Sequence, residues 1–432
     1  MANFITINNV ADILGASVAS IAKWVANGSY PAHTDERGRV GFHMEDLAGV
    51  APIRSMLESA WDEEMAVTPL RDYTSVELFA GAGGLALGMH KAGLRHALLS
   101  EVDKTACATL RANRPEWNVA HGDVRALDFS PLRGKVDFMS GGFPCQAFSF
   151  AGKKGGFGDT RGTLFFEMAR AVSEIRPKVF VGENVKGLLS HDDGRTLATI
   201  ENVVAELGYT LVPPRVLKAV MFQVPQKRER LILVAIRNDY AGRVNFRWPS
   251  PFRRVLTLRD ALEGGVLYDC AVPPSAGQSY PEKKRKVLAL VPEGGDWRNL
   301  PVDVQKEYLG KSFYSGGGKT GMARRLSMDE PSLTLTCAPA QKQTERCHPT
   351  ETRPLTVREY ARIQTFPDEW SFAGTTAEQY RQIGNAVPVN LAWALGRSVV
   401  RLLNDIQRLA PEEGRYAEAN EIAGRMALRA AE

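Results

Sequence analysis

Hydrophobic and polar positions follow two patterns in turn through the middle of the chain. Short aliphatic runs, most of them ending at a glycine or an acidic residue, alternate with stretches of helical periodicity. The expected strands are 75–79, 97–100, 119–121, 138–140, 179–182 and 230–236. Because strands that alternate with helices usually run parallel, this pattern predicts an α/β fold with a mostly parallel sheet.

The first 50 residues have a different pattern, of two short amphipathic helices separated by Gly15. Asn8 or Asn9 is expected to cap the first helix and Ser17 the second. Residues 37–43 contain two glycines and predict a short hairpin. Helix, tight turn, helix and wing form the plan of a winged helix-turn-helix module, and the segment resembles excisionase-like and MerR-like modules. A small helical cap without DNA contact is the alternative.

The regular alternation stops between residues 263 and 354. This stretch is rich in proline and glycine, carries the charge run EKKRK at 282–286, and has 13 basic against 11 acidic residues. It predicts an inserted, loop-rich domain, after which helical patterns return at 356–364 and 388–409. The predicted divisions are a module at 1–50, a connector at 51–72, a main domain at 73–262, the insert at 263–354, completion of the main domain at 355–410, and a tail or surface helix at 411–432.

Composition narrows the class of protein only moderately. The chain has 432 residues, a net charge of +5 and 44% hydrophobic residues, as expected for a globular protein of several domains with some affinity for a polyanion. Its five cysteines are an odd number without CxxC spacing, so we expect neither a disulfide framework nor a metal site. No apolar run approaches the ~20 residues of a membrane span, and no secretory signal is visible, so we expect a cytoplasmic protein.

A glycine-rich turn is the first candidate site. Residues 79–86, FAGAGGLA, follow an expected strand, open a helix and fit the G-x-G-x-x-G/A pattern of nucleotide-binding turns. Glu101, at the end of the next strand, can accept hydrogen bonds from ribose hydroxyls, and Asp123 can accept one from an adenine amino group. These features suit NAD and S-adenosylmethionine equally, so a nicotinamide-dependent oxidoreductase remains open at this point.

Further reactive side chains follow other strands of the same sheet. Cys145 lies in the segment GGFPCQAFS at 141–149, just beyond a strand, and Glu183 ends the next strand. Arg228 and Arg230 are two residues apart, which places both on one face of an extended strand. Taken singly, each has an ordinary alternative: a loop cysteine, a capping glutamate and a solvated charge run.

The order of these motifs resembles that of the cytosine-5 DNA methyltransferase family. The resemblance covers residues 74–262 and 354–400. Its most specific segments are GFPCQ at 142–146, ENV at 183–185, QKRER at 226–230, ARIQTFPD at 361–368 and QIGNAV at 382–387. It implies a Rossmann-like methyltransferase sheet dependent on S-adenosyl-L-methionine, with the insert as target recognition domain and duplex DNA as substrate.

The resemblance also implies roles for individual residues. Cys145 would attack carbon 6 of a cytosine flipped out of the duplex, Glu183 would hydrogen-bond ring nitrogen 3, and Arg230 with Arg228 would hold the base and the loop. Glu77 stands where the family usually has aspartate and is expected to help order the glycine-rich turn. The implied cofactor-binding residues are Phe79, Gly81, Gly83, Glu101, Asp123, Pro144 and Asn385. The implied DNA contacts are Gln146, Ser149, Lys319, Arg324, Arg325, Thr334, Gln341 and Gln343.

Two rivals remain beside the oxidoreductase. One is an RNA cytosine-5 methyltransferase on the same scaffold, and the other is a DNA-binding regulator without catalysis. The family further suggests a restriction-modification system with a cognate restriction endonuclease, and the N-terminal module is expected to add DNA binding or autoregulation.

Overall fold

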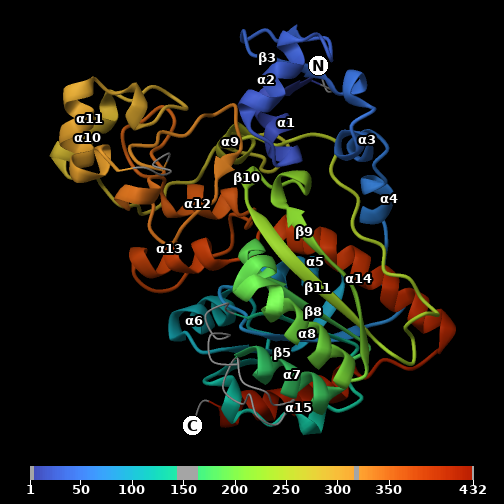
Figure 1. The fold of residues 1–432 in the computed structure, drawn as a ribbon. Coiled ribbons are helices and arrows are strands. Elements are labelled where there is room, and N and C mark those ends of the chain that lie inside the picture. Colours follow the sequence, from blue (N-terminus) through green and yellow to red (C-terminus); the bar gives the residue numbers. More distant parts are fainter. Residues whose placement is uncertain (1–3, 144–163, 316–320, 431–432) are drawn as a thin grey trace. The chain divides into compact units, whose positions relative to one another are not determined.

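The computed structural model describes residues 4–143, 164–315 and 321–430 of the chain. These residues form two compact units, which are described separately (Figure 1). The first unit comprises Met1–Ser59, Ala219–Arg228 and Pro251–Pro388, and the second comprises Ala60–Lys218, Glu229–Ser250 and Val389–Glu432. The first unit thus joins the predicted module and insert to parts of the predicted main domain, namely Ala219–Arg228 and residues 251–262 and 355–388.

The second unit is built on a seven-stranded sheet in the order β6-β5-β4-β7-β8-β11-β9. Neighbouring strands from β6 to β8 pair in parallel, whereas β11 is antiparallel to both β8 and β9, so the prediction of a mostly parallel sheet is confirmed. The strands are β4 (Tyr73–Leu78), β5 (Leu94–Glu101), β6 (Val119–His121), β7 (Phe138–Gly142), β8 (Val179–Asn184), β9 (Tyr209–Lys218) and β11 (Glu229–Arg237).

Helices cover this sheet and close its core. They are α4 (Trp61–Met65), α5 (Gly84–Lys91), α6 (Lys104–Asn113), α7 (Leu164–Ile175), α8 (Arg195–Glu206), α14 (Val389–Leu409) and α15 (Tyr416–Arg429), with 3-10 segments η2 (Val124–Ala126), η3 (Ser130–Leu132) and η5 (Lys186–Gly194). Helices α5 and α14 approach closely, because a Cβ on Gly88 would lie 2.4 Å from the Cβ of Ala392. The C-terminal segment, expected as a surface helix or tail, is a helix with Ala419 and Ala423 fully buried in the core.

The first unit begins with the N-terminal module, which we define as residues 4–59. It contains β1 (Phe4–Thr6), α1 (Ile7–Leu14), α2 (Val18–Ala26), β2 (His33–Thr34), β3 (Val40–His43), η1 (Met44–Leu47) and α3 (Ala51–Leu57). Its strands pair in the order β1-β3-β2, and residues 35–39 between β2 and β3 form the wing. Ser17 caps α2 as expected, whereas α1 starts two or three residues earlier than expected because the Thr6 side chain accepts the backbone N–H of Asn9.

The remainder of the first unit has short elements and a small core. Strand β10 (Gln226–Lys227) pairs in parallel with β12 (Ser332–Leu333). The helices are η6 (Ala219–Met221), α9 (Leu258–Leu262), α10 (Glu282–Ala289), η7 (Trp297–Asn299), α11 (Val302–Leu309), η8 (Gly310–Phe313), η9 (Lys342–Thr344), α12 (Val357–Ile363) and α13 (Thr376–Asn385). Among the residues that the structure describes, no helix combines the length and apolar character of a membrane span.

Candidate active site

The carboxyl ends of the parallel strands bring most of the predicted site residues of the second unit to one edge of the sheet. Strand β4 lies between β5 and β7, so the chain order reverses beside β4, and ligands of open α/β sheets bind at such a point. Phe79 follows β4, Glu101 ends β5, and Glu183 lies near the end of β8. The sheet therefore brings these side chains to its carboxyl edge, either within a strand or one residue beyond it.

The glycine-rich turn after β4 has an unusual backbone that a carboxylate holds in place. Phe79, Gly81 and Gly83 have φ angles of 57°, 53° and 86°, in the left-handed region that only glycine adopts without strain. One carboxylate oxygen of Glu101 accepts the backbone N–H of Gly81 at 2.7 Å, and the other accepts those of Val102 and Asp103. Glu101 therefore shapes the turn in addition to the ribose contact that the sequence predicts.

A second carboxyl group, that of Glu77, lies buried beneath this turn. The Ser140 hydroxyl hydrogen-bonds to it at 3.1 Å, and the backbone N–H of Ala86 in the first turn of α5 also reaches it. Burial raises the pKa of Glu77 to about 8 against these hydrogen bonds, and repulsion from Glu101 and Glu183 adds to the rise. Glu77 thus connects β4, β7 and the start of α5, the three elements that frame the turn.

Asp123 lies beyond β6 in a more open setting. Its carboxylate accepts hydrogen bonds from the Arg125 side chain at 2.9–3.0 Å and from the Arg125 backbone N–H. These hydrogen bonds lower the pKa of Asp123 to about 2. The carboxylate is therefore ionised at neutral pH and able to accept a further hydrogen bond from an amino group.

Glu183 is paired with Arg230 inside the same sheet. The Arg230 Nε lies 2.5 Å from a Glu183 carboxylate oxygen, and both side chains are only 11% exposed. The other carboxylate oxygen faces Gly142 at the end of β7, where a Cβ would lie 3.0 Å away. Glycine at this position therefore leaves room for Glu183 at the point where β7 leads into the Pro-Cys segment.

Asn184, to which the sequence assigned no role, fixes the start of that segment. Its side-chain NH₂ donates to the carbonyl oxygen of Phe143 at 2.8 Å, and its oxygen accepts the N–H of Val185. Phe143 is the last described residue before Pro144. The position of Asn184 next to Glu183 in the ENV motif was the available signal. The predicted site residues Pro144, Cys145, Gln146, Ser149 and Lys319 lie outside the described residues.

Arg228 and Arg230 do not share one face of a strand. Arg228 lies between β10 and β11, outside both strands, and belongs to the first unit, whereas Arg230 lies in β11 of the second unit. The Arg228 side chain is buried and donates to the carbonyl oxygens of Leu335 and Gly384 at 3.4 and 2.9 Å. In the first unit it ties the segment after β12 to the end of α13.

Three of the sequence motifs meet within the first unit through buried amides. The Gln226 side chain donates to that of Gln364 at 2.9 Å and accepts the N–H of Leu335. Gln364 in turn donates to the carbonyl oxygens of Ile383 and Ala386 at 2.7 and 3.2 Å, on either side of the predicted cofactor residue Asn385. Asn385 itself is exposed, and the Cys337 thiol lies 3.1 Å from its side-chain oxygen. The QKRER, ARIQTFPD and QIGNAV motifs therefore form one hydrogen-bonded network.

The predicted DNA contacts in the insert fall into two groups. Thr334, Gln341 and Gln343 are exposed, and Arg324 is partly exposed with an ion pair to Asp296 at 3.4 Å. Arg325 is buried, and its guanidinium is fully used inside the unit. Its acceptors are the carbonyl oxygens of Leu288, Val291, His348, Pro349 and Glu351 and the hydroxyl of Thr352. This geometry argues against Arg325 as a DNA contact.

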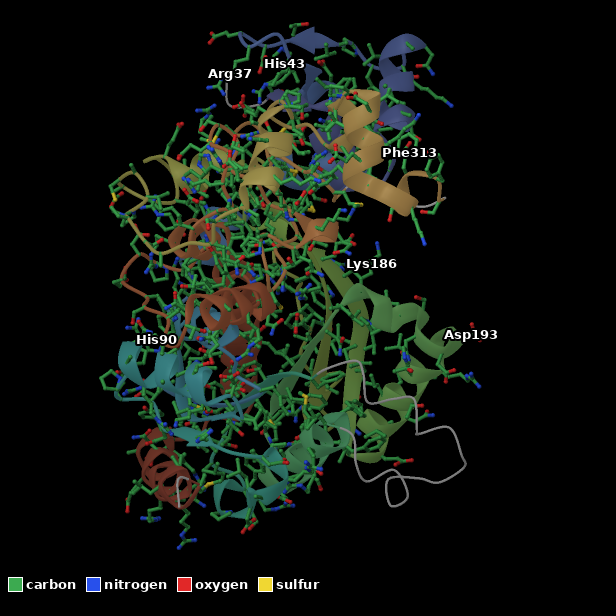
Figure 2. All side chains as sticks on the ribbon, turned by 90° about the vertical axis from the view of Figure 1, so that its left-hand side faces the viewer. Arg37, His43, His90, Lys186, Asp193 and Phe313 are labelled. Carbon is green, nitrogen blue, oxygen red and sulfur yellow. The ribbon has the colours of Figure 1, made fainter. Side chains whose placement is uncertain are left out.

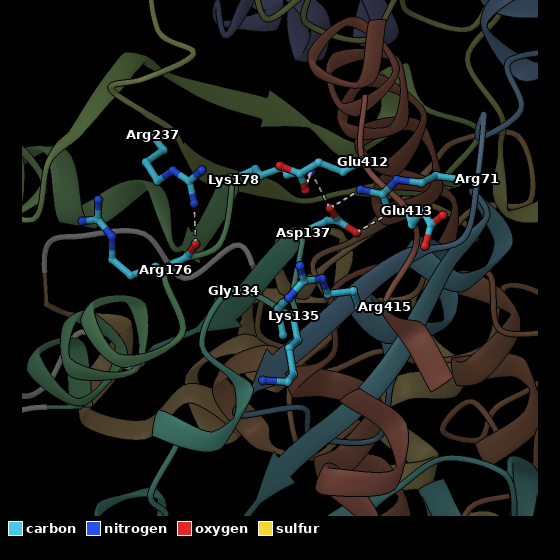
Figure 3. A pocket seen from close by; sticks show the side chains of 11 residues that line it. Arg71, Gly134, Lys135, Asp137, Arg176, Lys178, Arg237, Glu412, Glu413 and Arg415 are labelled. Carbon is cyan, nitrogen blue, oxygen red and sulfur yellow. Dashed lines mark hydrogen bonds and ion pairs between the residues drawn. The ribbon is translucent and has the colours of Figure 1, made fainter. Parts of the chain in front are cut away.

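A pocket of about 160 Å³ lies at the opposite edge of the large sheet, where β7 and β8 begin (Figure 3). Its centre is the buried Asp137 carboxylate, which receives both terminal nitrogens of Arg71 at 2.6–2.9 Å and the Lys178 ammonium at 3.1 Å. Lys178 also pairs with Glu412, between α14 and α15. Because Arg71 and Lys178 are already paired with carboxylates that line the pocket, we interpret this centre as a structural ion cluster. Within the described ranges, no three His, Cys, Asp or Glu side chains group as they would around a metal ion.

Comparison with known proteins gives the class that this fold and site define. A family model described as C-5 cytosine-specific DNA methylase matches residues 73–401. The Type II methyltransferase M.Eco47II of Escherichia coli is 60% identical over 404 residues, which is 93% of this chain and 97% of that protein. The Type II methyltransferase M.PspPI of Psychrobacter sp. (strain TA137) is 58% identical over 396 residues, or 91% and 95% of the two chains.

A likeness in fold extends to more distant proteins. The crystal structure of a DNMT2 mutant from Spodoptera frugiperda has a TM-score of 0.55 against this chain at 17% sequence identity. The likeness covers 77% of this chain and 99% of that chain. At that identity the likeness concerns the fold alone. The sheet, the motifs at its edge and the family match together show that the chain belongs to the C-5 cytosine-specific DNA methylase family.

Proposed function

We propose that this chain transfers a methyl group from S-adenosyl-L-methionine to carbon 5 of a cytosine flipped out of a specific duplex DNA site. The main observation that supports this proposal is the ion pair of Glu183 with Arg230, in which both side chains are largely buried. The pair lies beside Gly142, at the end of the strand from which the Pro-Cys motif continues. Such a pair suits hydrogen bonding to a planar heterocycle that has left the base stack. The family membership supports the reaction class, and the pair supports a role for Glu183 and Arg230 in it.

The cofactor-binding residues of the second unit fit S-adenosylmethionine. Space is open beside Gly81, where a Cβ would meet no atom within 4 Å, and the left-handed backbone excludes larger residues. The carboxylates of Glu101 and Asp123 can accept hydrogen bonds from ribose hydroxyls and an adenine amino group. Phe79 offers an aromatic face after β4. When bound, the cofactor supplies an electrophilic methyl group attached to a sulfonium.

The residues of this chain would supply the remaining chemistry. The Cys145 thiolate would add to carbon 6 of cytosine, which makes carbon 5 nucleophilic, and would leave again after methyl transfer and loss of the carbon 5 proton. Glu183 would hydrogen-bond to ring nitrogen 3, where negative charge develops during this addition. Arg230 would hold Glu183 in place and orient the cytosine carbonyl.

The biological setting is part of the same proposal. The similar proteins are named Type II methyltransferases, so we assign this chain to a restriction-modification system with a cognate endonuclease as genetic partner in the cytoplasm. Arg324, Thr334, Gln341 and Gln343 remain the proposed DNA contacts among the described residues, because polar side chains that reach water can reach base edges or phosphates. DNA binding or autoregulation by the N-terminal module is a prediction from the sequence alone, and the ion pairs of Arg37 and Arg39 inside the first unit argue against it.

A methyl-transfer assay tests this proposal. The full chain is incubated with labelled S-adenosylmethionine and either random-sequence duplex DNA or bulk tRNA, and modified positions are found by sequencing. Methylation at carbon 5 of cytosine in one short duplex sequence is the expected result, and the Cys145→Ser variant should give none. Transfer to tRNA alone, or no transfer with measurable NAD binding, would replace the proposal by one of its rivals.

A further inference from the structure

The N-terminal module has a charge that does not favour DNA. Its sequence contains four Lys or Arg residues against six Asp or Glu residues. Proteins that bind duplex DNA obtain most of their nonspecific affinity from cations placed on phosphates. Helix α2, which would enter a groove in a helix-turn-helix protein, carries a single basic side chain, that of Lys23. The wing arginines are therefore the main cations available for such contacts.

Both wing arginines are occupied within the first unit. The Arg37 guanidinium, on the wing of the module (Figure 2), forms an ion pair with the Asp329 carboxylate. Arg39 pairs with Asp35 at 2.6 Å and donates to the Asp329 carbonyl oxygen at 3.3 Å. Arg259 also lies 3.2 Å from the Asp329 carboxylate. Both arginines of the wing thus contact Asp329.

A second set of polar contacts joins the module to Glu330, the residue after Asp329, and to β10. The side-chain NH₂ of Asn8 in α1 donates to the Glu330 carboxylate. The Lys227 ammonium, on β10, lies 2.8 Å from Asp12 of the module and 3.3 Å from Glu330. Lys227 therefore ties the module and residue 330 to the strand that carries the QKRER motif.

Apolar contacts support these ion pairs. The core of the module, which includes Val10, Ile21 and Phe42, extends to Met221 and Val255 from outside the module. Met221 lies five residues before β10, and its carbonyl oxygen accepts the N–H of Phe252. The module is thus packed on the rest of its unit through apolar side chains as well as through ion pairs.

The contacts of the module reach the strand pair β10–β12, which Arg228 and Thr334 directly follow. Residues 329–330 lead through Pro331 into β12, which pairs with β10. The Thr334 hydroxyl, just after β12, donates to the Lys227 carbonyl oxygen. Any movement of residues 329–330 would therefore be passed to the exposed Thr334 and to the Leu335 carbonyl that Arg228 holds.

We propose that the N-terminal module is an intramolecular brace, whose partner is the segment 329–330 with β10 of its own unit, and that it positions β10 and β12 for duplex DNA. This inference rests on the proposed function for its substrate. The wing is held by Asp329 instead of reaching DNA phosphates. Arg37 and Asp329 are positioning residues in this scheme and contact neither base nor cofactor.

A brace and a DNA-reading wing predict opposite effects of Asp329→Ala on DNA binding, so variants of Arg37 and Asp329 separate the two. The full-length variants Arg37→Ala, Asp329→Ala and their combination are compared for the dissociation constant of duplex DNA carrying the methylated site. A brace predicts that each single change weakens binding about threefold to tenfold, with the double variant no weaker than Asp329→Ala alone. Because the chemistry is untouched, the Michaelis constant for DNA rises while kcat is unchanged.

Matched controls and a salt series complete the test. Asp303→Ala and Arg54→Ala remove exposed charges elsewhere in the unit and should leave binding unchanged. Asp329→Asn keeps the shape of the side chain in case the alanine variant unfolds. A DNA-reading wing predicts instead that Asp329→Ala tightens binding, because a negative charge is lost and Arg37 is freed, and that Arg37→Ala lowers the salt slope by about 1. Either that pattern or unchanged binding in all variants overturns the brace.

A measurement independent of activity keeps this inference separate from the proposed function. Hydrogen exchange of the backbone amides in β10, β12 and residues 334–335 is compared between wild type and Asp329→Asn without DNA. Faster exchange at these amides in the variant is expected from a brace. If wild type methylates no DNA, the proposed function fails while this result still decides whether the module fixes the strand pair, and unchanged exchange overturns it.

Discussion

Arg230 holds Glu183 across the antiparallel pair β11–β8, with Nε 2.5 Å from one carboxylate oxygen. The second oxygen is left facing Gly142, at the end of β7. Asn184, next to Glu183, holds the carbonyl oxygen of Phe143 just beyond that glycine. Arg230 thus fixes the Glu183 carboxylate, and Asn184 fixes the backbone from which the Pro-Cys segment continues.

Removal of the Arg230 guanidinium is expected to lower turnover far more than DNA binding. Arg230→Ala leaves a buried carboxylate without its partner, so we expect kcat to fall about 10²–10³-fold, the scale of losing one preorganised hydrogen-bond group. Single-turnover methylation measures the effect. Arg237→Ala, at the other end of β11 and paired with Asp239, is the matched control and should keep kcat. Normal kcat in Arg230→Ala would contradict the role of the pair.

Glu101 is expected to affect cofactor affinity through the turn as well as through the ribose. Glu101→Ala removes the acceptor of the Gly81, Val102 and Asp103 N–H groups, so the dissociation constant of S-adenosylmethionine should rise more than about tenfold. Isothermal titration is carried out with the cofactor and with adenosine. Because both ligands carry the ribose, a loss of affinity for the cofactor that exceeds the loss for adenosine reports on the turn. Cofactor affinity within twofold of wild type would show that the turn keeps its shape without this carboxylate.

Glu77 is expected to make stability fall as pH rises toward 8. Its native pKa, raised by burial from 4.5 to about 8, exceeds the unfolded value, so the native state binds more protons between these limits. The contribution of Glu77 to the free energy of unfolding is therefore fully present below its unfolded pKa and is lost as pH rises through its native pKa. Glu77→Gln cannot titrate, so the wild type should lose roughly 1–4 kcal/mol relative to this variant between about pH 5 and 8. Urea unfolding measures both curves, and parallel curves would refute the prediction.

Arg325 is expected to stabilise the first unit without reading DNA. Arg325→Ala would leave five backbone carbonyl oxygens without their donor, including those of Leu288 and Val291, and should destabilise the unit by roughly 3–5 kcal/mol. Arg324→Ala, with its partly exposed side chain, should change the melting temperature little and alter DNA affinity. Thermal melting and DNA titration of both variants provide the comparison. A stable Arg325→Ala protein with altered sequence preference would restore its predicted role as a DNA contact.

The two neighbouring arginines show where sequence patterns stop being informative. Arg324 and Arg325 have the same chemistry and adjacent positions, and only the packing of residues 288–352 around one of them distinguishes their roles. The Gln226–Gln364 hydrogen bond joins residues 138 positions apart, and no local pattern indicates it. Such contacts depend on how distant segments pack together.

Features set by local sequence were predictable. Aliphatic runs ending at Glu101 and Glu183 gave the sheet and its carboxyl edge, because strand periodicity and turn residues are local properties. Strand β9 escaped prediction because Pro213 and Pro214 interrupt its pattern, which an edge strand tolerates. Helix α15 was expected at the surface, since alanine and charged residues alone do not show that Ala419 and Ala423 meet the core.

The central claim is that the Cys145 thiol forms a bond to the cytosine ring. Duplex DNA containing 5-fluorocytosine at the methylated position is incubated with the full chain and S-adenosylmethionine, since fluorine cannot leave as the carbon 5 proton does. Peptide mass spectrometry should find a covalent adduct on Cys145 that depends on the cofactor and is absent in Cys145→Ser. Methylation of ordinary DNA without any adduct on Cys145 in the fluorinated duplex would contradict the account.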